Sequence, residues 1–364
     1  MDLLLRLAVL AASRFSRTLQ IGVDREVAMN PWKPLLLATL LFFPALADAR
    51  SIYTDLCADE SEGYTLPPDP RSFATAENGF TSRWVSCHAA PPFPKCGEWQ
   101  AAVAEGKRIL EEQAMVGSLL GADAYNDLWR AWGETARPSQ PEFDARVRER
   151  YGFQPAPFHN PYPLPGDDPA ASGGGTGQLP MGLIQTKSGG EYDGGIGLTC
   201  LACHAGRVAA QSVVGLGNNT VELQTFLQDV LSVDGTTAPV APPLVGGQTR
   251  GSVDADYGFA VLQAVRDLDT LDPSPFVKAH LLAIRVGDQD PPNWWNKGSR
   301  PRLLFDGGVP ADNTRTFMAF LMADTSASGD AIKAWEPAFE KIYAYLDSIE
   351  PPAYPGAAPE PVKV

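Results

Sequence analysis

The sequence predicts a mainly α protein with long Pro/Gly-rich loops and little β structure. Glycine (34 residues) and proline (33 residues) are both frequent among the 364 residues, above average usage but below the range of low-complexity chains. Between the loops, several segments space their apolar residues at the period of a helix. The 44% hydrophobic content is enough for a sizeable core. The length allows one large domain or two ordinary ones.

Helices are expected wherever this spacing persists. The clearest begins after Asn219 or Thr220, which are both capping residues, and continues to about residue 233 with one apolar face. No internal repeat is found. Extended pieces are expected only at 181–186 and 207–214. The other expected helices cover about 98–120, 122–134, 142–151, 254–268, 313–322 and 329–349.

The N-terminus has the pattern of a signal peptide at residues 1–49. An apolar run from Pro34 to Leu46 is followed by Ala47-Asp48-Ala49, an A-x-A cleavage site. The run has about thirteen residues, too few to span a bilayer comfortably. We expect the true start at Met29, with a longer N-terminal anchor as the alternative. The mature, exported chain is expected to begin near Arg50, without a stable membrane span.

The most informative segment is residues 197–206, Gly-Leu-Thr-Cys-Leu-Ala-Cys-His-Ala-Gly. Cys-x-x-Cys-His is the attachment signature of a c-type haem. Two residues between Cys200 and Cys203 let one helical turn present both sulfurs to the two vinyl groups of one porphyrin. The adjacent His204 then lies under the iron as an axial ligand. The sequence therefore predicts one covalently bound haem c.

A redox dithiol and a zinc site are the alternatives for this motif. A redox dithiol expects a thioredoxin-like βαβ context, which the surrounding sequence does not provide. A zinc site would need a second ligand pair, and only Cys87-His88 with Cys96 offers one. Cys87-His88 also resembles the end of a haem motif, but Trp84 stands where its first cysteine should be.

Three of the five cysteines lie outside the haem motif. Cys87 and Cys96 enclose a short proline-rich loop and could pair, which would leave Cys57 alone. Disulfide connectivity cannot be deduced from sequence. Disulfides of any pattern would fit an exported protein.

The sixth ligand of the iron decides between two kinds of haem. A Met or His ligand gives an electron-transfer haem, whereas an open position allows reactions with peroxide or O₂. Met181 follows a proline close to the motif and is the weak first choice; an open or weakly held position is the expectation. The candidates by residue type are His88, His159, His280, Met115, Met181, Met318 and Met322.

Further residues could serve the haem. Trp294-Trp295 could wall a pocket or relay electrons, although a packed loop anchor is the simpler interpretation. Guanidinium groups match the carboxylates of haem propionates, which makes Arg207, Arg300 and Arg302 candidates.

Gly-Leu-Thr-Cys-Leu-Ala-Cys-His-Ala-Gly-Arg-Val at 197–208, followed by Gly-Leu-Gly-Asn at 215–218, resembles the bacterial di-haem cytochrome c peroxidase-like proteins, including the rubber-oxygenase-like group. The resemblance covers roughly residues 180–350. It implies a periplasmic or secreted oxidoreductase with two haems, one reacting with peroxide or O₂ and one passing electrons. This sequence has only one Cys-x-x-Cys-His, which puts the two-haem mechanism in doubt.

These observations divide the chain into four expected parts. Residues 1–49 are the signal peptide, and 50–165 are an N-terminal region of helices and loops. A Gly/Ser/Asp linker then opens a cytochrome c-like haem domain at 166–350. Residues 351–364 are a Pro/Ala-rich tail, or a linker to a missing second haem domain.

The net charge of −14 bears on partners. An acidic chain is a poor match for nucleic acid phosphates. It could steer a small basic cytochrome as redox partner, although solubility alone also explains the charge. The expected function is an exported c-type cytochrome oxidoreductase with reactivity toward peroxide or O₂. The alternative is an electron carrier or haem-binding subunit without its own substrate.

Overall fold

The computed structural model describes 52–67, 93–115, 117–160, 178–188, 191–233, 247, 249–267, 270–280, 287–295, 297, 300, 302–303, 309–310, 317–318, 321 and 327–352. These residues all belong to one compact unit, Ala49–Val364. The expected signal peptide, the expected domain boundary at 165–166 and nearly all of the tail lie outside the described residues. Among the described residues, no helix combines the length and apolar content needed to cross a membrane.

The expectation of a mainly α, cytochrome c-like fold with little β is wrong. The described residues form a mixed α/β fold, with about 44% of them in helices and 14% in strands. In the described part, β2 (Leu183–Ser188) and β3 (Glu191–Leu198) form an antiparallel hairpin, and β1 (Leu120–Gly121) pairs with the other edge of β3. A second hairpin joins β4 (Ala205–Val208) to β5 (Gln211–Val214), and a small pair joins β6 (Arg302–Leu303) to β7 (Val309–Pro310).

The glycines at 194, 195 and 197, just before the Cys-x-x-Cys-His motif, explain part of the error. They suggest a loop by composition, yet they lie in strand β3. A Cβ on Gly195 would lie 2.3 Å from Oγ1 of Thr186 and 2.5 Å from Oγ of Ser118. Glycine in a strand often marks such a close approach of neighbouring groups. Asp193 stabilises this close approach of β2 and β3, because its Oδ1 accepts hydrogen bonds from the Thr186 hydroxyl and from the Gly195 amide.

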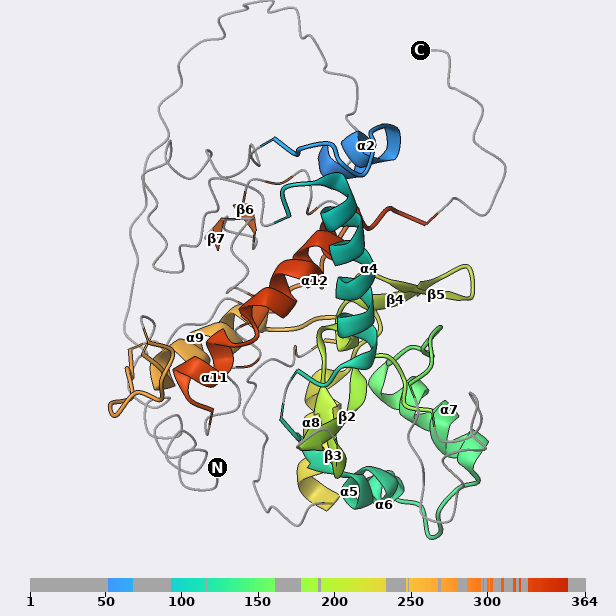
Figure 1. Ribbon diagram of the computed structural model, residues 1–364. Coiled ribbons are helices and arrows are strands. Elements are labelled where there is room, and N and C mark those ends of the chain that lie inside the picture. The colour runs from blue at the N-terminus through green and yellow to red at the C-terminus, as the bar shows by residue number, and fades with distance from the viewer. Residues whose placement is uncertain are drawn as a thin grey trace, which may run out of the picture. The chain divides into compact units, whose positions relative to one another are not determined.

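Two long helices form the upper part of Figure 1: α4 (Cys96–Glu112) and α12 (Glu336–Ser348). They pack along each other, and a Cβ on Gly106 of α4 would lie 2.0 Å from the carbonyl oxygen of Lys341 on α12. The short helix α2 (Ile52–Asp59) packs on α4 and is fixed there by a disulfide. Cys96 forms this disulfide with Cys57 rather than with Cys87, which lies outside the described residues.

Turns interrupt two of the expected helices. The expected helix at 122–134 is two pieces, α5 (Ala122–Asn126) and α6 (Leu128–Ala131). The expected helix at 329–349 divides into α11 (Gly329–Lys333) and α12. Most of the expected helix at 313–322 lies outside the described residues. The other helices, close to their expected positions, are α7 (Gln140–Tyr151), α8 (Leu223–Val233) and α9 (Ala255–Val265).

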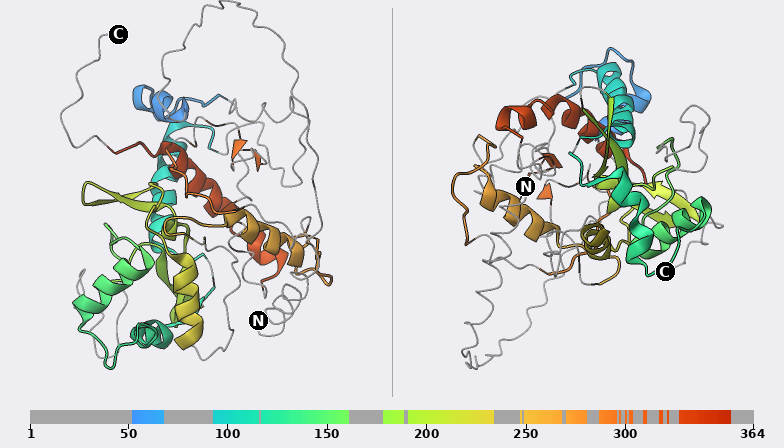
Figure 2. Two further views of the ribbon diagram at one scale, coloured as in Figure 1. Left: turned by 180° about the vertical axis from the view of Figure 1, so that it is seen from behind. Right: turned by 90° about the horizontal axis from the view of Figure 1, so that it is seen from below.

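Two large hydrophobic cores organise these elements, and a smaller third cluster surrounds the disulfide between α2 and α4. What we call the first core lies beneath α4 and α12, and the second core lies among α5–α8 and the β2–β3 hairpin, which are grouped in both views of Figure 2. The first core consists of Ile109, Leu110, Met115, Met181, Leu201, Ala205, Leu271, Trp294, Met318, Leu321, Ile332, Phe339, Ile342, Leu346 and Ile349. The second core consists of Leu120, Tyr125, Leu128, Phe143, Val147, Tyr151, Phe153, Leu179, Leu183, Ile196, Ala202, Val221, Leu223, Phe226, Val230 and Val253.

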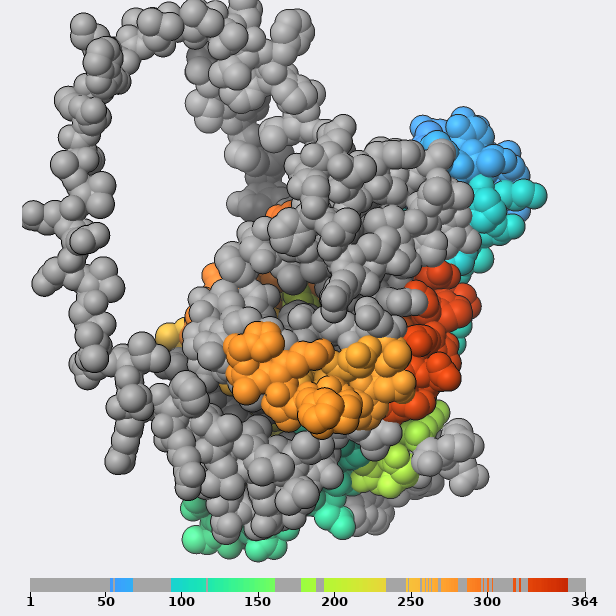
Figure 3. All heavy atoms as spheres, turned by 90° about the vertical axis from the view of Figure 1, so that its left-hand side faces the viewer, coloured from blue at the N-terminus to red at the C-terminus, as the bar shows by residue number. Residues whose placement is uncertain are grey.

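The segment that follows α9 lies at the surface beside the C-terminal helices, as the orange and red spheres of Figure 3 show. Its contact with α11 includes a hydrogen bond from the Gly329 amide to Oδ1 of Asp272, 2.7 Å long. Phe276 and Val277 expose apolar side chains on this segment. The segment is distant in sequence from the Cys-x-x-Cys-His motif, and among its described residues Leu271 belongs to the first core.

Candidate haem-attachment site

The Cys-x-x-Cys-His motif is the link between the two hairpins. Strand β3 ends at Leu198, one 3₁₀ turn (Cys200–Ala202) follows, and β4 begins at Ala205. The Thr199 amide donates to the Gly182 carbonyl at 2.8 Å, which fixes the entry to the turn, and the His204 amide donates to the Cys200 carbonyl at 3.0 Å. A single tight turn thus carries both cysteines and leads directly into His204.

The two cysteines are half-buried free thiols that contact different cores. Cys200 packs against the first core and Cys203 against the second. Burial raises the pKa of the Cys200 thiol to about 11, and burial together with the neighbouring Cys200 raises the pKa of the Cys203 thiol to about 12. Redox dithiols instead need a lowered thiol pKa, because the thiolate is the nucleophile. The surroundings therefore weigh against a dithiol oxidoreductase.

The structure weighs against the alternative of a zinc site at this motif. The second ligand pair that it requires includes Cys96, whose sulfur is bonded to Cys57 and is not free to coordinate. Among the described residues, no group of three or more His, Cys, Asp and Glu side chains is placed to hold a metal ion.

His204 is held by two contacts from the loop that contains Trp294. Its Nδ1 lies 2.9 Å from the carbonyl oxygen of Pro292, and its ring stacks on the Trp294 ring with centroids 4.7 Å apart. A carbonyl only accepts hydrogen bonds, so Nδ1 carries the proton and the lone pair resides on Nε2. Burial lowers the pKa of His204 to about 4, although the hydrogen bond to Pro292 acts in the opposite direction. The imidazole is therefore neutral near pH 7, which is the form that ligates metals.

Residues 215–218 connect this loop to the motif. The Gly215 amide donates to the carbonyl of His204, and the Trp294 amide donates to the carbonyl of Gly215, both at 2.8 Å. The Gly217 amide donates to Oδ1 of Asn293 at 3.0 Å. A Cβ on Gly217 would lie 1.8 Å from the Pro291 carbonyl oxygen, so only glycine allows this approach.

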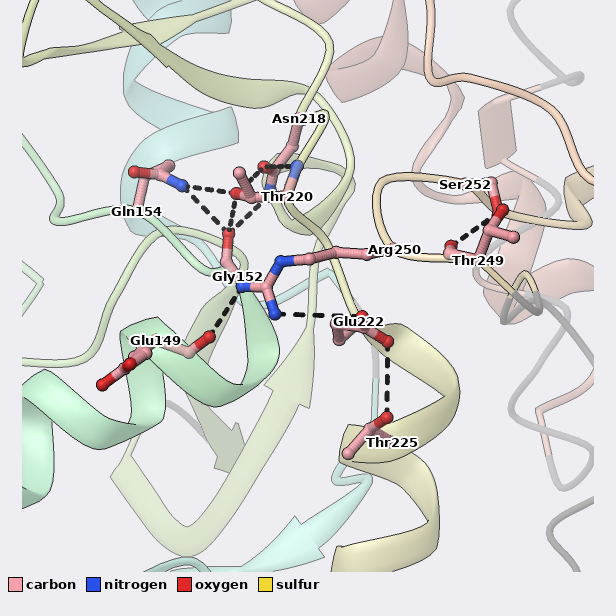
Figure 4. A network of polar contacts seen from close by, with 10 residues as sticks. All are labelled: Glu149, Gly152, Gln154, Asn218, Thr220, Glu222, Thr225, Thr249, Arg250 and Ser252. Carbon is pink, nitrogen blue, oxygen red and sulfur yellow. Dashed lines mark hydrogen bonds and ion pairs between the residues drawn. The ribbon is translucent and has the colours of Figure 1, made fainter.

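Asn218 joins the motif to the second core. Its amide donates to the Cys203 carbonyl at 2.8 Å, and its side-chain Nδ2 donates to the carbonyls of Ala202 and Gly152, both at 2.9 Å. Gly152 ends α7 in the left-handed region (φ 70°). Figure 4 shows Thr220 and Gln154 completing this network around the Gly152 carbonyl. The end of α7 is therefore tied to the turn that carries the two thiols.

Trp294 tests whether these residues fit a haem. Its side chain is only 4% exposed, and its Nε1 has no hydrogen-bond acceptor among the described residues. A buried indole N–H without an acceptor is costly, and such groups usually have a partner. A haem propionate would supply a carboxylate acceptor beside His204. Together with the apolar surfaces on either side of the cysteines, this makes the site a good fit for haem c.

The sixth-ligand candidates divide by environment. Met181 is fully buried in the first core, together with Met115 and Met318. Its amide donates to the Gln154 carbonyl at 2.8 Å. The next residue, Gly182, packs on the 3₁₀ turn, since a Cβ there would lie 2.4 Å from the Ala202 Cα. The backbone at Met181 and Gly182 therefore lies close in space to the turn that carries the two cysteines. His159 and His280 are exposed, and His88 and Met322 lie outside the described residues.

The arginine candidates receive less support. Arg207 on β4 and Arg300 are both exposed, and Arg302 belongs to β6. Trp295, unlike its neighbour, is half-buried at the edge of the first core. The Pro292 carbonyl, which the sequence did not single out, contacts His204, and the same loop includes Lys297, which forms a buried pair with Asp347. The Trp294-Trp295 pair pointed to this loop, but not to the carbonyl that contacts the histidine.

No protein family and no curated protein matches the chain. The resemblance to di-haem peroxidase-like proteins thus stays a prediction, and the assignment rests on the site itself.

Proposed function

We propose that this protein is an exported c-type cytochrome that acts as an oxidoreductase, with one haem c attached through Cys200 and Cys203 and ligated by His204. The observation that carries the proposal is the hydrogen bond between His204 Nδ1 and the Pro292 carbonyl. Metal-ligating histidines almost always donate their other ring N–H in this way, which fixes the tautomer and the ring orientation.

The chain's own residues would bind and orient the haem. Both thiols would form thioethers to its vinyl groups, Trp294 Nε1 would donate to a propionate, and the two cores would keep water from its faces. Bound haem would supply one-electron redox chemistry and an iron position at which peroxide or O₂ can react. The disulfide between Cys57 and Cys96 supports export, because such bonds persist in oxidising compartments. The net charge of −14 supports a basic redox partner, such as a small cytochrome.

Covalent attachment is tested by exporting the chain in a host with a cytochrome c maturation system. Haem should stay with the polypeptide in a denaturing gel stained for haem peroxidase activity. The double variant Cys200→Ala/Cys203→Ala should lose the stain completely. The matched control, Cys57→Ala/Cys96→Ala, removes the same number of sulfurs and should keep it. Haem that extracts into acid–organic solvent from the wild type would contradict the proposal.

Export is tested separately by the intact mass of periplasmic material. The mature chain should begin at or near Arg50. Retention of Met1, or recovery of the protein only from the cytoplasm, would contradict this part of the proposal.

The alternative, an electron carrier without its own substrate, is favoured by one observation. Met181 is a fully buried methionine, and its neighbour Gly182 accepts a hydrogen bond from the Thr199 amide at the entry to the 3₁₀ turn, so a thioether lies near the motif. Carbon monoxide separates the two functions. Stoichiometric CO binding by the reduced wild type, with a shifted Soret band, supports peroxide or O₂ reactivity. A reduced wild type that ignores CO, while Met181→Ala binds it, supports the carrier.

A further inference from the structure

A buried ion pair joins the end of the loop that holds His204 to helix α12. Nζ of Lys297 is 2.6 Å from Oδ1 of Asp347, and both side chains are almost inaccessible to solvent. The same Nζ lies 4.0 Å from the ring centroid of Tyr343, one turn earlier on α12. The charge of Lys297 is thus held by a carboxylate and by the face of an aromatic ring, both provided by one rigid helix.

This pair connects to His204 through two short steps. The Lys297 amide donates to the Trp294 carbonyl at 2.7 Å, which closes a turn over residues 294–297. Trp294 stacks on the His204 ring, and Pro292, two residues earlier, accepts from His204 Nδ1. The position of the acceptor for His204 therefore depends on where α12 holds Lys297.

Stability alone does not account for such a pair. The cost of removing two charges from water often exceeds their attraction, so apolar residues of similar size are frequently as stabilising. Buried ion pairs can instead specify one arrangement of the chain. Here the pair fixes to α12 the loop that supports the haem ligand.

We infer that Lys297 and Asp347 are positioning residues, which hold the Pro292 carbonyl in hydrogen-bonding reach of His204 and thereby set the electron-donating strength of the haem ligand. The inference rests on the proposed function. A firm hydrogen bond to Nδ1 makes the imidazole a more basic ligand, which favours the oxidised iron. Loss of the pair should therefore loosen this bond and raise the reduction potential.

The test compares three variants with the wild type. Lys297→Met/Asp347→Val replaces the pair with apolar side chains, and Lys297→Arg preserves the charge. Arg150→Met is the matched control, because Arg150 also pairs with an aspartate (Asp229) and lies over a tyrosine ring, in the second core. The chain has only four histidines, so ¹⁵N-histidine labelling gives a spectrum in which His204 can be assigned.

Two quantities are measured: the exchange rate of the His204 Nδ1 proton in the reduced protein under CO, and the reduction potential. In the apolar double variant we expect melting close to the wild type, proton exchange at least ~10-fold faster, and a reduced-to-oxidised ratio ~10-fold higher at a fixed potential, equivalent to ~59 mV for one electron. Lys297→Arg should recover much of both effects, and Arg150→Met should match the wild type in both.

Wild-type exchange and potential in the double variant would overturn the inference. So would failure of the double variant to fold, because the pair would then be structural. A wild type isolated without haem would overturn the proposed function instead, and the proton-exchange comparison on that protein would still decide the role of the pair.

Discussion

The two hydrophobic cores contain the same device used in two ways. In the second core, Arg150 and Asp229 join α7 to α8, and the Tyr151 hydroxyl between them donates to Asp229 and accepts from Trp132, both at 2.8 Å. In the first core, Lys297 and Asp347 join a loop to a helix. The Arg150–Asp229 pair joins two helices, whereas the Lys297–Asp347 pair positions the loop that contacts the candidate haem ligand.

The cores also differ in whether one indole in each has an acceptor. In the second core, the Trp132 indole donates to the Tyr151 hydroxyl, which donates to Asp229. In the first core, the buried Nε1 of Trp294 is left without an acceptor among the described residues. The Tyr151 network is therefore complete, whereas Trp294 keeps hydrogen-bonding capacity for a ligand beside His204.

The largest expected effect concerns the second core. Phe226 is fully buried and lies 5.1 Å, between ring centroids, from both Tyr151 and Phe153. Phe226→Ala should lower the free energy of unfolding by about 3–5 kcal/mol, through lost burial and a residual cavity. Chemical denaturation measures the loss, and the folded fraction should retain its haem per chain. A loss under about 1 kcal/mol would show that this core is not tightly packed.

The next comparison breaks the two ion pairs singly. Asp347→Ala leaves a buried ammonium without its carboxylate and should cost about 3–5 kcal/mol. Arg150 is about 40% exposed, so Arg150→Met should cost only about 1 kcal/mol, as for solvent-screened pairs. Urea unfolding of both variants provides the two values. Equal losses would contradict the distinction between the two cores.

A glycine at the junction of the two loops should give a smaller effect with a spectroscopic consequence. Gly217→Ala forces a Cβ against the Pro291 carbonyl, and overpacking of this kind costs about 1–3 kcal/mol. Because the displaced segment includes the acceptor for His204, the haem spectrum should change as well. Gly329→Ala is the control: it clashes with the Thr270 carbonyl, at the contact of α11 with the segment that follows α9. A changed spectrum in that variant alone would contradict the described route to His204.

The chemistry of the site was more predictable than its surroundings. Cys200, Cys203 and His204 are consecutive enough that one turn must bring them together, so their spacing suffices. The support for His204 comes from Pro292, 88 residues away. No local pattern encodes such a contact, since it depends on how α12 and the loop pack.

The fold was predictable where the helix period is strong, as in α7 and α8. It was not predictable at β3, where composition indicates a loop and tertiary contacts decide otherwise. Gly195 lies in a strand because β3 pairs with β1 and β2, and it is a glycine because Ser118 and Thr186 occupy the space that a Cβ would need. The disulfide between Cys57 and Cys96 likewise depends on the packing of α2 on α4, which the spacing of the cysteines does not reveal.

The smallest expected effect is a pH dependence at the start of α7, the helix that ends in Arg150 and Tyr151. Glu142 accepts hydrogen bonds from the hydroxyl and the amide of Ser139, a capping box, and these bonds hold its pKa below the usual 4.5. A carboxyl whose pKa is lower when folded contributes stability above its unfolded pKa, and loses it as the pH falls through the folded pKa.

Glu142→Gln tests this effect, because the amide oxygen can still accept from Ser139 but cannot titrate. We expect the wild type to have the higher urea midpoint at pH 7, and the two midpoints to converge as the pH falls below 4.5. Because Glu142 is exposed, added salt should reduce the part of the difference that comes from the charge of Arg146. A difference that stays constant from pH 7 to acid would mean that the carboxylate charge does not stabilise the cap. Any change in the haem spectrum of this variant would contradict the expectation that the start of α7 does not affect the haem site.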